Sequence, residues 1–375
     1  MMDSNIITIA KKEFFDHVRS RKFLAILGIF LIVAVVGSIN GLNQYNDTLK
    51  LYNEFQKQVS SSDHPQDIPS FVGNKPSILL VFFQISLSIL LVGSILGMAM
   101  GFDLISKEKE SKSLKILLSH PVYRDQVING KALGGLAALI LALAIVLTIS
   151  LASLLVFGII PNGSEIILIA IFSIISFVFI STYFSIALFI STISGESGTA
   201  LVYTMIIYIL TTALIPVLMS TPILDGITGP APEIPKVLSE RMMSFSSDSN
   251  EITISPMNSQ SIELDTDFRE FQREMEEYNN KQMAIVDLLY LISPNKNYEK
   301  ITLAITMPQL AGLIYGSQKE VQDPVNSGFT STSSETTIPI ADILAMVGKN
   351  LIALFIFPTV FFGLAYVTFM RMDIR

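Results

Sequence analysis

The sequence predicts an all-α membrane protein with six transmembrane helices, and three observations lead to this prediction. Half of the 375 residues are hydrophobic and the mean hydropathy is +0.55, which is typical of membrane proteins rather than soluble enzymes. Charged residues make up only 15% of the chain and gather in a few segments. Six apolar runs reach the length of about 20 residues that a helix needs to cross a bilayer.

The six runs are free of charged side chains within their limits, so each can lie in lipid. Helices are expected because irregular backbone in lipid would leave peptide groups without hydrogen bonds. No small-residue cleavage motif follows the first run, so we expect it to remain as an anchor rather than be removed as a signal peptide. The expected spans are residues 23–41, 77–102, 132–158, 166–192, 199–219 and 351–369.

Lysine and arginine are divided unequally between the two sides of the expected topology. The side with residues 1–22, segment 103–131, the short loop after residue 192 and the C-terminal tail has 13 basic and nine acidic residues. The other side has 12 basic and 23 acidic residues. Because basic loops stay on the cytoplasmic side, both termini and segment 103–131 are expected in the cytoplasm.

The chain therefore divides into four expected parts. Its large insertion between spans 5 and 6 should be extracytoplasmic and mainly α or α+β, with a long helix at 263–289 and an interfacial or re-entrant helix at 298–315. Residues 4–20 form an amphipathic helix whose stripe is Ile7, Ala10, Phe14 and Val18. The parts are 1–22 (this cytoplasmic helix), 23–219 (spans 1–5 with segment 103–131), 220–350 (the outer domain) and 351–375 (span 6 and a cytoplasmic tail).

Two groups of residues within the spans have more than one interpretation. Gly93, Gly97 and Gly101 make a ridge of small residues on which another helix can pack, either from the same subunit or from a second copy. Hydroxyl groups line one face of span 5, where they bond the backbone one turn back or form a mildly polar substrate path. These hydroxyl residues are Thr204, Tyr208, Thr211 and Thr212.

The charged segment 103–131 lies between two spans and must face water on one side of the membrane. Its apolar positions from Ile105 to Leu118 follow a helical period, and Pro121 then breaks the helix. The segment is either a solvated loop that fixes span orientation by its charge or a docking surface for a soluble protein.

Residues of this segment resemble the membrane subunits of ABC-2 type ABC transporters, the permeases. The matching pattern is Glu108-x-Glu110, then Ser113-Leu114, then Leu117-Leu118-Ser119-x-Pro121-Val122-x-Arg124, and finally Gly130-Lys131. The resemblance extends over most of the chain to the ending Phe369-Met370-Arg371-Met372-Asp373-Ile374. This chain has Lys112 where the family has glycine, so the turn there is expected to differ.

The resemblance implies an exporter in a prokaryotic cell (plasma) membrane. Two permease subunits, as a homo- or heterodimer, would pair in the lipid above two ABC ATPase subunits, which would bind ATP and Mg²⁺. Segment 103–131 would dock on the ATPase as a coupling helix. The residues implied in this contact are Glu108, Glu110, Leu114, Leu117, Leu118, Pro121 and Arg124.

Enzymatic chemistry in the chain itself is not expected. There are no cysteines, and the three histidines have neither metal-site spacing nor an H-E-x-x-H motif. The Gly-Lys pairs at 130–131 and 348–349 lack the other residues of a P-loop, so energy must come from elsewhere. No catalytic, metal or cofactor site and no nucleic-acid partner are expected.

Two other functions remain possible from the sequence. A non-transporting scaffold could display the acidic outer domain, and such a protein would tolerate charge reversal at Glu108 and Glu110. An ion-gradient-driven transporter is disfavoured because no span contains a carboxylate, the usual handle for protons or sodium.

Overall fold

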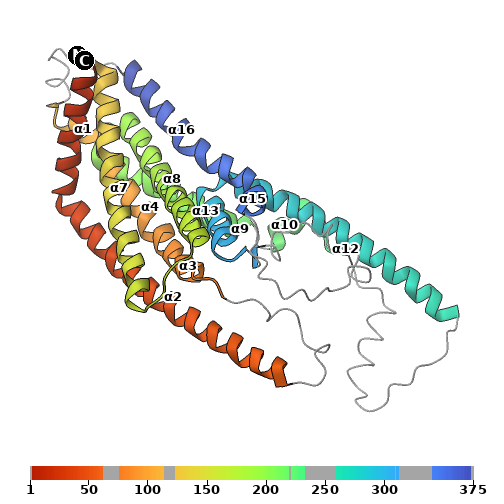
Figure 1. Cartoon of the computed structure of the whole chain (residues 1–375). Coiled ribbons are helices and arrows are strands. Elements are labelled where there is room, and N and C mark those ends of the chain that lie inside the picture. The colour runs from red at the N-terminus through yellow and green to blue at the C-terminus, as the bar shows by residue number, and fades with distance from the viewer. Residues whose placement is uncertain are drawn as a thin grey trace. The chain divides into compact units, whose positions relative to one another are not determined.

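The computed structural model describes residues 2–61, 76–113, 123–218, 221–232, 259–308, 310–311 and 340–372 (Figure 1). Every regular element in these ranges is helical. Two compact units are present: one joins Met1–Ile209 to Pro294–Arg375, and the other is Leu210–Ser293. The larger unit contains most of the expected spans, and each unit is described by itself.

Six helices in the described ranges are long and apolar enough to cross a membrane, as predicted. They are α2 (Arg21–Ser61), the continuous rod of α3 (Leu79–Ser88), η3 (Ile89–Gly93) and α4 (Ser94–Gly101), then α7 (Arg124–Val156), α8 (Gly163–Ile193), α9 (Ser197–Leu218) and α16 (Gly348–Arg371). The main difference from the predicted spans is the length of α2. The apolar run ends at residue 41, but the polar residues that follow continue the helix to Ser61. A π-helical turn, η3, interrupts the second span.

Helix α8 forms the packing centre of the larger unit, in contact with α4 and α16 along much of its length (Figure 1). The glycine ridge of the second span makes this contact possible. A Cβ atom on Gly97 would lie 2.5 Å from the carbonyl oxygen of Ile180, and one on Gly101 would lie 2.6 Å from that of Phe184. Both glycines therefore let two helix backbones approach more closely than any side chain allows.

The N-terminal helix α1 (Met2–Val18) lies along α7 rather than standing apart from the bundle. Ala10, Phe14 and Val18 are partly buried, as the predicted stripe requires, whereas Ile7 is 65% exposed. Gly130 of α7 permits the contact, because a Cβ there would lie 2.8 Å from Cβ of Ile9.

Helix α13 (Pro294–Thr306) lies among the spans, where it packs against α3, α8 and α16. The sequence predicted an interfacial or re-entrant helix at 298–315. The observed helix begins four residues earlier and ends at Thr306, and 11 of its 13 residues are buried. Its two less buried residues, Lys296 and Glu299, pair with each other at 2.8 Å. This burial excludes an exposed surface helix.

The smaller unit contains the end of α9, the short helix α10 (Thr221–Thr228) and the long helix α12 (Ser259–Ile292). Helix α12 confirms the helix predicted at 263–289. The described part of 220–350 contains helices α10, α12, α13 and α15 (Ile340–Met346) and no strand. Much of the expected outer domain lies outside the described residues.

Candidate functional site

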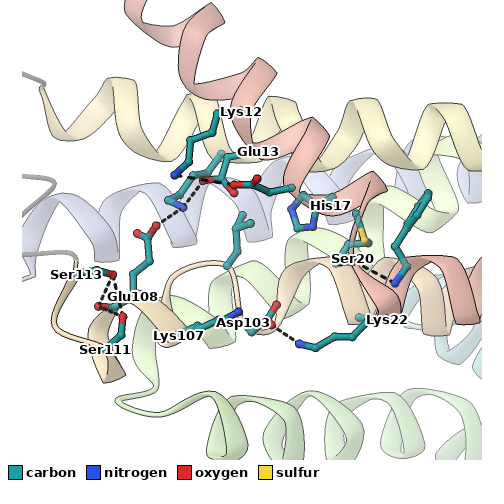
Figure 2. A pocket seen from close by; sticks show the side chains of 16 residues that line it. Lys12, Glu13, His17, Ser20, Lys22, Asp103, Lys107, Glu108, Ser111 and Ser113 are labelled. Atoms are coloured by element: carbon teal, nitrogen blue, oxygen red, sulfur yellow. Dashed lines mark hydrogen bonds and ion pairs between the residues drawn. The ribbon is translucent and has the colours of Figure 1, made fainter.

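A buried lysine of α7 connects this helix to α1 and to the segment between the second and third spans, which carry Glu13 and Glu108 (Figure 2). The Nζ atom of Lys131, on α7, lies 2.7 Å from Oε1 of Glu13 on α1 and 2.7 Å from Oε1 of Glu108 on α5 (Ser106–Glu110). The lysine side chain is only 3% exposed. A buried cation is costly to desolvate, so it persists here because two carboxylates surround it. We call Glu13, Lys131 and Glu108 the charge triad.

Local packing explains how the triad forms. A Cβ on Gly134 would lie 2.6 Å from Cβ of Glu13, so this glycine brings α1 against α7 one turn beyond Lys131. The carboxylate of Glu13 thereby reaches the lysine across the helix contact. Glu108 reaches it from the segment between the second and third spans.

The charged residues next to Glu108 fasten α5 to the ends of two neighbouring spans. Lys109 donates through Nζ to the carbonyl oxygens of Thr192 and Ser194, at the C-terminal end of α8. Glu110 accepts hydrogen bonds through Oε2 from the backbone N and Oγ of Ser197, at 3.1 and 2.6 Å. A cation at a helix C-terminus and an anion at a helix N-terminus both complement the helix dipole.

Two further contacts extend this arrangement. The hydroxyl of Ser191 on α8 accepts from the backbone N–H groups of Ile105 and Ser106, at 3.0 and 2.9 Å. Arg124 donates to the carbonyl oxygens of Met370 and Met372, at 3.2 and 2.8 Å, which lie at the end of α16. Within the described residues, segment 103–131 is therefore bonded to α1, α8, α9 and α16.

Three predicted coupling residues, Glu108, Glu110 and Arg124, lie in the described structure and bond to other helices of the same chain. The other four, Leu114, Leu117, Leu118 and Pro121, lie outside the described residues.

The expected single helix from Ile105 to Leu118 is wrong, because α5 ends at Glu110. Lys112 then takes a positive φ of 56°, a left-handed conformation that ends a right-handed helix. This is the position where the resembling family has glycine.

A mixed-charge cavity of about 270 Å³ lies beside the triad (Figure 2). His17 of α1 lines it. Burial and, more weakly, Lys131 lower the pKa of the His17 imidazole below its ordinary value of 6.5, although the nearby carboxylates of Glu13, Asp103 and Asp16 oppose this shift. The imidazole is therefore neutral near pH 7.

A second polar cluster lies where α13 enters the spans. The hydroxyls of Tyr298 and Ser176 are 2.9 Å apart, and the Tyr298 ring stacks on Phe179 with ring centres 4.3 Å apart. Nδ2 of Asn350 on α16 donates to Oδ1 of Asn297 at 2.7 Å. The hydroxyl of Tyr183 donates to Oδ1 of Asn295. These bonds fix α13 to α8 and α16.

The predicted hydroxyl face of span 5 has two kinds of partner. Thr204 donates to the carbonyl oxygen of Ala200 at 2.7 Å, which is the bond one turn back along its own helix. Tyr208 instead meets another helix, because Oγ of Ser94 donates to its hydroxyl at 3.3 Å. Thr211 and Thr212 belong to the smaller unit, where the carbonyl of Thr211 accepts from Ser293 at 3.1 Å.

The predicted glycine ridge packs within the chain. A Cβ on Gly93 would lie 3.2 Å from the Ile180 side chain, so Gly93 joins Gly97 and Gly101 against α8. No group of three histidine, aspartate or glutamate side chains within the described ranges could hold a metal ion.

Sequence comparison identifies the family. The model of a family described as "ABC-2 family transporter protein" matches residues 7–374. The chain belongs to the ABC-2 transporter family. The probable ABC transporter permease protein NosY of Pseudomonas aeruginosa PAO1 is 29% identical over 165 residues, or 44% of this chain and 50% of that protein. The match therefore spans about half the length of this curated relative.

Membership of the ABC-2 family agrees with the six apolar helices. The chain is a multi-pass membrane protein of a transporter family. The family in general operates with an ABC ATPase partner. The sequence did not identify Glu13, Ser191 or Ser197 as site residues. Lys131 was present in the family motif, as part of the Gly130-Lys131 pair, but its partner Glu13 was not predicted.

Proposed function

We propose that this ABC-2 permease moves a substrate outward across a prokaryotic plasma membrane, driven by separate ATPase subunits that bind ATP and Mg²⁺ and dock on segment 103–131. One observation carries the proposal. Through Lys109, Glu110 and Lys131, the short helix α5 is bonded to α8, α9, α7 and α1 at once. A force applied to this segment therefore reaches several spans.

The division of labour within the segment follows from these contacts. Glu108, Glu110 and Arg124 bind segment 103–131 to other helices of the same chain. The leucines between them and Pro121 then provide the surface for the ATPase, since an apolar stripe fits a groove on a partner. Closure of the ATPase pair would tilt α7, α8 and α16 as rigid elements between two states.

The described surface also favours a second permease copy, in a homo- or heterodimer. The glycine ridge is already occupied by α8, whereas α9 has few buried residues. Its large exposed side chains include Val202, Tyr203 and Ile206, each more than 50% exposed. We propose that lipid and the second copy share this face, with Thr204, Tyr208, Thr211 and Thr212 beside the substrate path.

Polar contacts hold helix α13 against α8 and α16. Its buried hydrogen bonds to α8 and α16 hold a polar helix among apolar spans, and such bonds can rearrange when the spans tilt. The orientation proposed is the one expected from charge: both termini inside and the insertion 220–350 on the outer side, from which α13 enters among the spans. Both termini lie at one end of the larger unit, which agrees with an even number of spans (Figure 1).

Co-purification tests the proposal. Tagged permease would be extracted from its own cells in mild detergent, and the co-eluting proteins would be identified. We expect an ABC ATPase with the parent protein and its loss in the variants Leu117→Asp/Leu118→Asp and Glu108→Lys/Glu110→Lys. Leu51→Asp is the matched control, because Leu51 is an exposed leucine on α2 far along the chain from segment 103–131.

The two alternatives predict different results. A scaffold or an ion-driven transporter would purify without an ATPase in both parent and variant forms. ATPase retained by the leucine variant but lost from the glutamate variant would place the docking surface on the charged residues instead. Folding of each variant is checked by its elution volume and thermal unfolding.

A further inference from the structure

The mixed-charge cavity beside the triad is lined by equal numbers of cationic and anionic side chains. Its walls come from α1, from the start of α2 with the linker before it, from the end of the second span, from α5 with the residues after it, and from α7 (Figure 2). The cations are Lys12, Lys22, Lys107 and Lys131, and the anions are Glu13, Asp16, Asp103 and Glu108. With His17 neutral, the lining has no net charge, so it does not favour a simple cation or a simple anion.

Several of these charged side chains form ion pairs with one another. Lys131 forms ion pairs with one carboxylate oxygen of Glu13 and one of Glu108, and Lys22 forms an ion pair with Asp103. The pair of Lys12 and Asp16 is exposed and 4.0 Å apart, so it contributes little.

Two polar atoms in the lining are buried and have no hydrogen-bond partner among the described residues. They are Oε2 of Glu108 and Nε2 of His17. A buried polar atom without a partner costs about 1–3 kcal/mol. A ligand with N–H donors would remove this cost at Glu108. Lys107, exposed at the rim, has no ion pair in the described structure and remains available to an anion.

The other wall of the cavity is apolar. Phe23, Met100 and Leu104 line it and are themselves buried. Phe15 and Leu24, each next in sequence to a lining residue of α1 or α2, are 42% and 54% exposed. Apolar side chains on an amphipathic helix at the end of the spans are typical of the membrane interface. A ligand in this cavity can therefore have its polar end here and its apolar part in lipid.

We infer that the mixed-charge cavity binds the phosphoethanolamine group of a membrane lipid, with its ammonium on Oε2 of Glu108 and its phosphate near Lys107 and Lys12. A zwitterion matches a lining of zero net charge. The ammonium provides the N–H donors that Glu108 lacks, and lysine is a frequent partner of phosphate. The apolar wall selects the lipid rather than free phosphoethanolamine. The inference does not depend on an ATPase partner.

Choline lipids are the matched control, because they carry the same phosphate but a different ammonium group. Their quaternary ammonium has no N–H group, so it leaves Oε2 of Glu108 without a hydrogen bond. A site that hydrogen-bonds its ligand discriminates strongly against an analogue without the donor. We expect phosphatidylethanolamine to bind about tenfold more tightly than phosphatidylcholine, which corresponds to one hydrogen bond to a charged group at the low end of its range.

The test is native mass spectrometry of the full chain purified from nanodiscs of equimolar phosphatidylethanolamine and phosphatidylcholine with matched acyl chains. The expected result is about one retained phosphatidylethanolamine per chain, with about tenfold less phosphatidylcholine. Glu108→Gln should reduce this preference at least threefold, whereas Lys107→Gln, which removes a partner of the phosphate common to both lipids, should reduce the retention of both at least threefold. Lys50→Gln, an exposed lysine on α2, should leave preference and retention unchanged. Since Lys107 has no ion pair in the described structure, its variant tests binding without disturbing the fold.

Three outcomes would overturn the inference. Equal retention of the two lipids would exclude recognition of the ammonium. A preference that survives Glu108→Gln, or retention of both lipids that survives Lys107→Gln, would place lipid binding elsewhere on the protein. Saturable binding of soluble phosphoethanolamine in pure phosphatidylcholine nanodiscs, with displacement of phosphatidylethanolamine at millimolar concentration, would assign the cavity to a soluble ligand.

Discussion

The ammonium of Lys131 lies 2.7 Å from Oε1 of Glu108, although 23 residues and the turn between two spans separate the two side chains in the sequence. Replacement of Lys131 by methionine would leave Glu108 and Glu13 without their shared cation. Breaking a buried ion pair from one side costs about 3–5 kcal/mol. We expect the lower end, because the Glu108 side chain keeps 21% exposure.

Thermal unfolding in detergent measures this effect, and combination variants provide the control. Lys131→Met with Glu13→Gln and Glu108→Gln removes all three charges, so it should recover most of the stability lost by Lys131→Met alone. A single variant as stable as the parent would contradict the structural role of the triad.

Lys112→Gly should stabilise the protein. Lys112 has a φ of 56°, a conformation that costs a residue with a side chain about 1–2 kcal/mol and costs glycine little. Glycine also gains freedom in the unfolded chain, so the net gain should be about 0.5–1 kcal/mol. Lys107→Gly is the matched control in α5 and should destabilise by about 1 kcal/mol. Melting temperatures that move the same way for both variants would refute the argument.

Gly97→Ala should destabilise the bundle by about 2 kcal/mol, because its new Cβ would lie 2.5 Å from the carbonyl oxygen of Ile180. The helices must separate to admit it. Gly28 offers the comparison, since nothing lies within 4 Å of a Cβ built there. Gly28→Ala should change stability by less than about 1 kcal/mol, in the stabilising direction. Urea or heat unfolding of the two variants tests the difference.

Acid should weaken the protein through His17. Its folded pKa lies below 6.5, so the unfolded chain binds this proton at a higher pH than the folded chain does. The stabilising contribution is complete above pH 6.5 and declines as the pH falls toward the folded pKa. The slope for one group is at most about 1.4 kcal/mol per pH unit.

Melting temperatures between pH 7.5 and 5.5 measure this dependence, and His17→Gln should make the profile flatter. The groups that face the imidazole are Glu13, Asp16, Asp103 and Lys131, and these remain in the variant. An identical profile in parent and variant would show that other residues cause the acid sensitivity.

Tyr298→Phe should cost about 1 kcal/mol, because it leaves Ser176 without the hydroxyl at 2.9 Å. Tyr298→Ala also removes the stacking on Phe179 and a fully buried ring, so we expect a loss of about 3–5 kcal/mol. Tyr203→Phe is the control on an exposed tyrosine of α9 and should have no effect. Thermal unfolding in detergent measures the three stabilities.

The number of spans could be predicted from the sequence because each span is a local property: an uninterrupted apolar run. The helices at residues 4–20 and 263–289 could be predicted because a periodic apolar stripe is also a local property of the sequence. The end of α5 was not, since it depends on the left-handed backbone of Lys112, which its residue type does not reveal.

The charge triad could not be predicted because its members are brought together only by helix packing. Glu13 is 118 residues from Lys131, and nothing in the local pattern around either residue identifies the other. Glu108 and Glu110 were singled out by a motif, but their partners Lys131 and Ser197 come from other helices. Helix α13 was ambiguous because its polar residues resemble those of a surface helix until their buried partners are known.

Helix α2 is much longer than the membrane is thick. At 41 residues it measures about 60 Å, whereas the hydrocarbon core is about 30 Å. One half is therefore anchored among the other spans and the other half projects as a rod. A rotation of the anchored half by about 5° would swing the far end by about 5 Å, given the helix rise per residue. A small tilt of α2 within the bilayer therefore displaces the residues near Ser61 much further than the residues among the other spans.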